Sequence, residues 1–250
     1  MAEKTDKTTL TGLARHLGQL PADKKRAALE ISAALAGVSL RVSREFVEAV
    51  PGAAEILSAD DLRHWGEFGR RLAMGSSVTG VELFAGGIDE IEKVPEASRS
   101  VVFNICTRQL VTSSSTALNS YRSMPRLAAA FADEKRLAEV LDLALEIANR
   151  SAKHSADFLE HTPPVAAALA RFDDAVADEV LSLARNFADR TGGLTAELWQ
   201  QLPAALDELS SADAVLLMRH AAEFLDLGGS VTLHFIAGGS DVLKTSPRTF

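Results

Sequence analysis

An internal repeat restricts the fold of this 250-residue sequence more than any other feature. Aligned on one small residue, here called the anchor, the chain repeats with spacings of 37, 37, 38, 40 and 37 residues. The six anchors are Ser39, Ser76, Ser113, Ser151, Thr191 and Gly228. Periods of this length are typical of arrays in which every unit is a pair of helices. The sequence therefore predicts about six tandem helix pairs.

Upstream of each anchor, small and large side chains recur with helical spacing. Seven residues before the anchor, at position −7, every repeat has a small residue. These residues are Ser32, Gly69, Cys106, Ala144, Ala184 and Ala221. Positions −11 and −4 are mostly large and apolar, so the three positions form one face of a helix. We expect this first helix of each repeat to end near the anchor and to meet another helix closely at the small residue.

Downstream of each anchor, turn-forming residues precede a second apolar pattern. Runs such as residues 75–77 and 191–193 favour a sharp turn, after which a second helix begins at the anchor. Position +4 is again small, and position +12 is proline in four repeats: Pro51, Pro125, Pro163 and Pro203. We expect these prolines to end the second helix or to open a short third one, as in residues 125–131 or 203–209. One long helix per repeat is the alternative, because apolar spacing continues through the turn.

A single helix pair cannot bury its apolar face, whereas stacked pairs form a continuous core. The expected fold is therefore all-α, an α-solenoid of about six HEAT- or ARM-like repeats of ~37 residues each, forming a curved rod. Low aromatic content, 6% of the chain, agrees with close helix packing. We expect a single repeat domain over residues 10–245, with residues 10–20 as a capping helix. Residues 1–9 are expected to be flexible, and residues 246–250 to form a tail.

The charge distribution favours a protein partner over nucleic acid. The chain has a net charge of −8, and residues 133–213 hold 16 acidic against 7 basic residues. Residues 63–126 hold 8 basic against 6 acidic residues. An acidic surface repels phosphate backbones and attracts a basic protein. The alternative is a solvated acidic surface that only keeps the protein in solution.

Cysteine content and hydropathy predict the compartment. The single cysteine, Cys106, excludes an internal disulfide. The N-terminal segment lacks the apolar core of a secretory signal, and no run reaches the ~20 apolar residues of a membrane span. We therefore expect a cytoplasmic protein without membrane insertion.

Few residues suggest chemistry. His154, Asp157 and His161 have i, i+3 and i+7 spacing, which could place three metal ligands on one helix face. The spacing typical of helical zinc sites, two histidines at i and i+4, is absent, so a solvated polar face is the favoured interpretation. His220 and Glu223 form a second helical pair without a third ligand. The sequence contains no nucleophile motif and no phosphate-binding glycine motif, so we assign no catalytic residue and no cofactor.

Three side chains that could serve a site fall on core positions of the repeat. Cys106 takes the small position −7, and Trp65 and Trp199 take the apolar positions −11 and +8. We interpret all three as core residues rather than as a nucleophile and a stacking pair.

Residues 63–84 (RHWGEFGRRLAMGSSVTGVELF) and 146–165 (EIANRSAKHSADFLEHTPPV) resemble the helical repeats that precede the von Willebrand factor A domain in NorD- and CbbO-type proteins. The resemblance covers residues ~25–245. It implies an activator that works with a MoxR-type AAA+ ATPase to remodel a metalloenzyme, such as nitric oxide reductase or Rubisco. The Asp-x-Ser-x-Ser motif of metal-dependent adhesion is absent, so that role is not implied and no functional residue is transferred.

Taken together, these patterns predict a non-catalytic adaptor or scaffold that binds proteins, with the AAA+ ATPase or the metalloenzyme as candidate partners. Two alternatives stay open. One is an enzyme on HEAT-like repeats, such as an alkylpurine-type DNA glycosylase, although that activity requires a basic groove. The other is a structural subunit of a larger enzyme complex, which an exposed apolar terminal repeat would favour.

Overall fold

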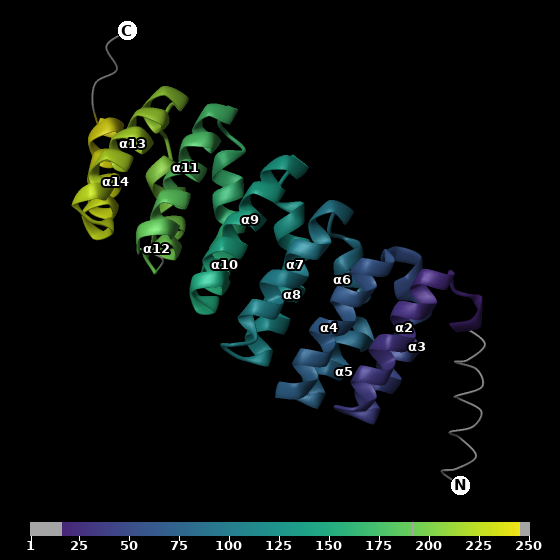
Figure 1. Cartoon of the computed structure of the whole chain (residues 1–250). Coiled ribbons are helices and arrows are strands. Elements are labelled where there is room, and N and C mark those ends of the chain that lie inside the picture. The colour runs from purple at the N-terminus through teal and green to yellow at the C-terminus, as the bar shows by residue number, and fades with distance from the viewer. Residues whose placement is uncertain (1–16, 192, 246–250) are drawn as a thin grey trace. The chain divides into compact units, whose positions relative to one another are not determined.

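The computed structural model describes residues 17–191 and 193–245, and every regular element in these ranges is a helix (Figure 1). The helices are α2 (Ala22–Ala36), α3 (Leu40–Ile56), α4 (Ala59–Gly75), α5 (Ser77–Gly86), α6 (Ile88–Glu92), α7 (Glu96–Gln109), α8 (Ser114–Ala129), α9 (Glu134–Arg150), α10 (Ala152–Leu169), α11 (Asp174–Thr191), α12 (Leu194–Leu206), α13 (Ser211–Phe224), the 3-10 helix η1 (Leu225–Leu227) and α14 (Gly229–Thr245). The fold is an all-α helical repeat, as the sequence predicts.

The chain divides into two compact units, Met1–Pro125 and Arg126–Phe250, and each is described by itself. A single domain over residues 10–245 stays a prediction. The expected flexible segment 1–9 and tail 246–250 lie outside the described residues, as does most of the expected capping helix 10–20.

Each repeat consists of two helices that meet at the anchor. The first helices are α2, α4, α7, α9, α11 and α13, and the second helices are α3, α5, α8, α10, α12 and α14. Five second helices begin directly after their anchor, where the side chains of Ser39, Ser113 and Ser151 accept backbone N–H groups as N-caps. The fifth repeat has the longest spacing, and α12 begins at Leu194 instead. The alternative of one long helix per repeat is therefore wrong.

The small positions −7 and +4 lie where the two helices of a repeat cross. The Ser43 hydroxyl donates to the carbonyl of Ser32 at 3.0 Å, and the Ser155 hydroxyl donates to that of Ala144 at 2.9 Å. At Gly69 the approach is closer still, because a Cβ there would lie 2.0 Å from Cζ of Phe84. These crossings explain why the two positions admit only small residues.

Aromatic rings fill the junctions between repeats in the first unit. The ring centroid of Phe46 in the first repeat lies 5.8 Å from that of Trp65 and 5.1 Å from that of Phe84, both in the second repeat. Tyr121 donates its hydroxyl to the carbonyl of Gly87, one repeat earlier, at 2.5 Å. Burial raises the pKa of Tyr121 well above its usual value, so the phenol stays a neutral donor.

In the described part of the second unit, aromatic rings meet at Phe158–Trp199 and, within the last repeat, at Phe224–Phe235. Phe158 stacks on Trp199 with centroids 4.6 Å apart, and the indole N–H donates to the Thr162 hydroxyl at 3.0 Å. Thr162 and Trp199 are fully buried, so this hydrogen bond satisfies the indole nitrogen inside the core.

The prolines at position +12 do not end the second helices. Pro51, Pro125, Pro163 and Pro203 lie inside α3, α8, α10 and α12. The predicted break is wrong because residues beyond the prolines, such as Ala53, Val165 and Leu206, are buried in the core. Their packing outweighs the loss of one backbone hydrogen bond. The short helix α6 instead follows Gly86 and Gly87 in the second repeat, which lacks this proline.

The last repeat differs from the others at position −8. Five repeats bury a large apolar side chain there: Ile31, Phe68, Ile105, Leu143 and Leu183. The sixth has His220, which is exposed and whose Nδ1 lies 3.2 Å from Oε2 of Glu223.

Candidate protein-binding surface

The structure does not bring the candidate metal ligands together. His154, Asp157 and His161 all lie on α10 and are half-buried. Within residues 17–191 and 193–245, no three side chains of His, Cys, Asp or Glu are placed to hold a metal ion. The His154 ring packs against the start of α12, where a Cβ on Gly193 would lie 3.0 Å from its Cε1. Helix packing thus accounts for His154 without a metal.

The other candidate residues serve the core or the turns. Cys106, Trp65 and Trp199 have no exposed surface, which confirms their interpretation as core residues. Burial raises the pKa of the Cys106 thiol far above its usual range, so it is not a thiolate nucleophile. The Ser113 hydroxyl lies within hydrogen-bond distance of Ser115 and Thr116 at the start of α8.

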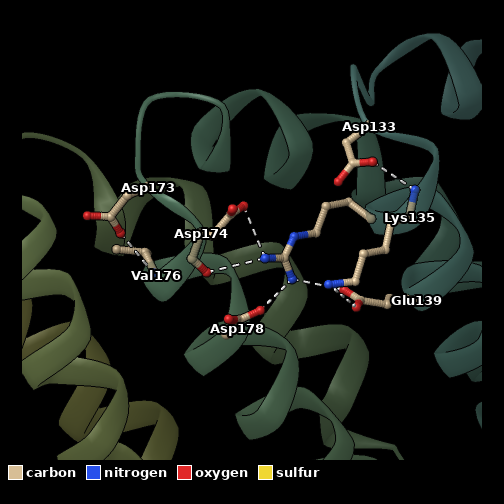
Figure 2. Close-up of polar contacts among 8 residues, drawn as sticks. Asp133, Lys135, Glu139, Asp173, Asp174, Val176 and Asp178 are labelled. Carbon is tan, nitrogen blue, oxygen red and sulfur yellow. Dashed lines mark hydrogen bonds and ion pairs between the residues drawn. The ribbon is translucent and has the colours of Figure 1, made fainter.

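Arg136 on α9 forms ion pairs with carboxylates of α9 and α11, the first helices of two neighbouring repeats in the second unit. Figure 2 labels these carboxylates, Glu139, Asp174 and Asp178. Its guanidinium donates hydrogen bonds to Glu139 at 2.9 Å, Asp178 at 2.6 Å and Asp174 at 3.1 Å. Partial burial opposes the charge of Arg136, but the hydrogen bonds to Asp178 and Asp174 outweigh it and raise its pKa. This arginine therefore links neighbouring repeats and is fully committed to partners within its own unit.

Four further ion pairs of the second unit join residues about one repeat apart. They are Arg150–Asp189, Arg171–Asp207, Arg190–Asp226 and Arg219–Glu179. Arg150 and Arg190 occupy position −1 of their repeats, and their partners occupy position −2 of the next repeat. Sequence analysis missed these pairs, although the recurrence of Arg at −1 and Asp at −2 could have revealed two of them.

These inter-repeat pairs use arginines of the first helices and loops, and carboxylates without an ion pair remain on the second helices of the second unit. Glu160 on α10 and Glu197 on α12 are exposed, and Asp157 on α10 is half-buried. Within the described residues none of the three makes an ion pair, and α10 packs directly against α12. Helices α10 and α12 together therefore carry three carboxylates without an ion pair and one exposed lysine, Lys153, also without an ion pair among the described residues, which leaves an excess of negative charge.

A groove of about 470 Å³ lies between α12 and α14, and Glu197 is one of the residues that line it. Its lining combines small apolar residues with polar and charged ones: Glu197, Gln201, Ala204, Ala205, Ser230, Leu233, His234, Ala237, Ser240, Asp241 and Lys244. The Ser240 hydroxyl donates to the carbonyl of Ala205 at 2.6 Å, and Lys244 donates to that of Ala204 at 2.9 Å, so α14 is tied to α12. Such a lining suits an extended peptide with both apolar and charged side chains.

Among the described residues, no helix is both long and apolar enough to cross a membrane. No protein-family model, no curated protein and no solved structure matches the chain. The resemblance of residues 63–84 and 146–165 to NorD- and CbbO-type proteins therefore gains no support from these comparisons.

Proposed function

We propose that this chain is a non-catalytic adaptor that binds a basic segment of another protein on the second helices of its second unit. The observation that carries the proposal is the difference in charge between the first helices and the second helices of the second unit. Inter-repeat ion pairs use arginines on the first helices and loops, whereas Asp157, Glu160 and Glu197 on the second helices make no ion pair among the described residues, and Glu197 lines the groove between α12 and α14. Lysines or arginines of a partner would pair with these carboxylates.

The family resemblance supplies a narrower version of this proposal. A repeat array of the NorD or CbbO type would present the basic partner, an AAA+ ATPase or a metalloenzyme, to the remodelling reaction.

The proposal is tested by affinity purification from native extract at low and moderate salt, with mass spectrometry of the eluted proteins. We expect a basic partner that the double variant Glu160→Lys/Glu197→Lys loses and that moderate salt releases. The matched control is Glu134→Lys/Glu146→Lys, which makes the same charge change on the first helix α9. Equal loss in both variants, or tight binding of duplex DNA at physiological salt, would overturn the proposal.

A second candidate function, a structural subunit of a larger complex, is supported by the last repeat. Four of its large apolar side chains are exposed: Leu216, Leu227, Val231 and Val242. Burial of these residues by another subunit would remove them from water. Recovery of a stoichiometric complex that Val242→Ser disrupts, and that the charge variants do not, would favour this role.

A further inference from the structure

The anchors of the first unit are flanked by exposed apolar side chains. They are Val38, Leu40, Met74, Val78 and Val111, and we call them the apolar turn edge. Leu40 is 78% exposed and Val111 is 88% exposed, so these side chains protrude into solvent. All five lie within two residues of an anchor, at the point where the first helix of a repeat passes into the second.

These turns follow one another along one edge of the unit. The second and third turns are in direct contact, because a Cβ on Gly75 would lie 2.3 Å from Oγ of Ser114. The first turn is next in line, since α2 packs against α4 and α3 against α5. Packed helices are spaced about 8–10 Å apart, so the apolar turn edge spans roughly 20 Å.

The charge beside the apolar turn edge is positive. Arg41 follows Leu40 directly, and Arg108 lies three residues before Val111. Within the part of the chain that the structure describes, neither guanidinium forms an ion pair. The turn segments 37–41, 74–80 and 108–115 contain no aspartate or glutamate. A ligand of this edge would therefore need apolar side chains together with carboxylates.

The repeat fold itself does not require apolar residues at these positions. In the fourth and fifth repeats, position −1 instead holds Arg150 and Arg190, which pair with Asp189 and Asp226 at position −2 of the following repeat; Leu227 at position −1 of the sixth repeat is again exposed and apolar. Exposed apolar side chains in a row are uncommon on proteins without a partner. The difference points to a binding function of the first unit's turns rather than to a folding constraint.

We propose that the apolar turn edge docks an acidic amphipathic helix of a partner protein. The apolar face of that helix covers Leu40, Val78 and Val111, and its carboxylates pair with Arg41 and Arg108. A helix of about 14 residues spans the three turns at 1.5 Å per residue. The net charge of −8 disfavours an anionic membrane as the occupant. This surface is distinct from the acidic second helices proposed above, so either can fail alone.

The test uses a fluorescein-labelled peptide of about 14 residues with leucine at i, i+3, i+4 and i+7 and glutamate on its polar face. Fluorescence anisotropy with the full chain measures its Kd. The triple variant Leu40→Ser/Val78→Ser/Val111→Ser is expected to weaken binding by about tenfold or more, because it removes the apolar contacts. Arg41→Glu/Arg108→Glu is expected to weaken it by roughly three- to tenfold at low salt and less at high salt.

The matched control is Leu227→Ser/Val231→Ser, which removes exposed apolar side chains at the equivalent turn of the last repeat and should leave Kd unchanged. All substituted residues are exposed, and circular dichroism melting verifies that the variants fold. Failure of the peptide to bind, equal binding by the triple variant, or equal binding of a lysine-substituted peptide would overturn the proposal. So would edge-dependent binding to phosphatidylcholine vesicles containing one-quarter phosphatidylserine, which would identify a membrane instead.

Discussion

Neighbouring repeats of the first unit meet through aromatic rings, while those of the second unit are joined at their surface by arginine–carboxylate pairs. In the first unit, Phe46 contacts both Trp65 and Phe84 of the next repeat, and most ion pairs, such as Arg70–Glu67, stay within one helix. In the second unit, Arg136 and four other arginines reach carboxylates of an adjacent repeat. The two units thus hold the same architecture with interactions of different salt dependence, since apolar packing is insensitive to screening.

The largest expected effect is steric and belongs to the first unit. Gly69→Leu places side-chain atoms where the Phe84 ring lies, because even a Cβ would be 2.0 Å from it. We expect the free energy of unfolding to fall by roughly 1–3 kcal/mol or more, measured by urea denaturation. Gly86→Ala, where a Cβ meets open space, is the control. An unchanged free energy in Gly69→Leu would refute the proposed crossing.

The next effect tests the ionic junction of the second unit. Arg136→Met leaves three carboxylates without their shared cation, and we expect a loss of about 1–2 kcal/mol at low salt. High salt should shrink this loss, whereas it should not change the Gly69→Leu effect. Arg185→Met, which removes an exposed arginine without an ion pair, serves as control. If the loss of unfolding free energy in Arg136→Met did not depend on salt, the two units would not differ in the salt dependence of their inter-repeat contacts.

A smaller effect is expected at the exposed pair Arg190–Asp226. Both side chains are more than half exposed, so the coupling energy should be below about 1 kcal/mol. A double-mutant cycle with Arg190→Met and Asp226→Asn measures that coupling. A coupling energy well above this limit would mean that the exposed pairs, and not Arg136 alone, hold the repeats together.

The smallest effect is a pH dependence in the first unit. Hydrogen bonding from Arg70, with a further bond from Arg71, lowers the pKa of Glu67 to about 2 from 4.5. A lowered folded-state pKa gives stability that is complete above pH 4.5 and is lost as pH falls toward 2. Glu67→Gln should therefore reduce the decline in unfolding free energy between these pH values. An identical decline in wild type and variant would show that other carboxylates cause it.

The periodic sequence predicted the helix pairs and their close crossings, because positions −7 and +4 depend only on spacing within one repeat. Gly69 and Ala144 could thus be placed in the core without a structure. The proline interpretation failed, since local propensity at Pro163 competes with burial of Val165 that only the folded array supplies. The groove between α12 and α14 could not be predicted from the sequence pattern of one repeat, because residues of two repeats line it.

The inter-repeat bonds of each unit also bear on how the chain folds. They join residues 33 to 43 positions apart, from Arg63–Glu30 to Arg99–Ile56. Each of these bonds brings together the ends of a chain segment about one repeat long. The entropic cost of forming each of these loops is therefore similar. Order can begin at any helix pair and spread to its neighbours in sequence, as in a one-dimensional lattice. Hydrogen exchange would then follow position along each unit, with the outermost helix pair opening first.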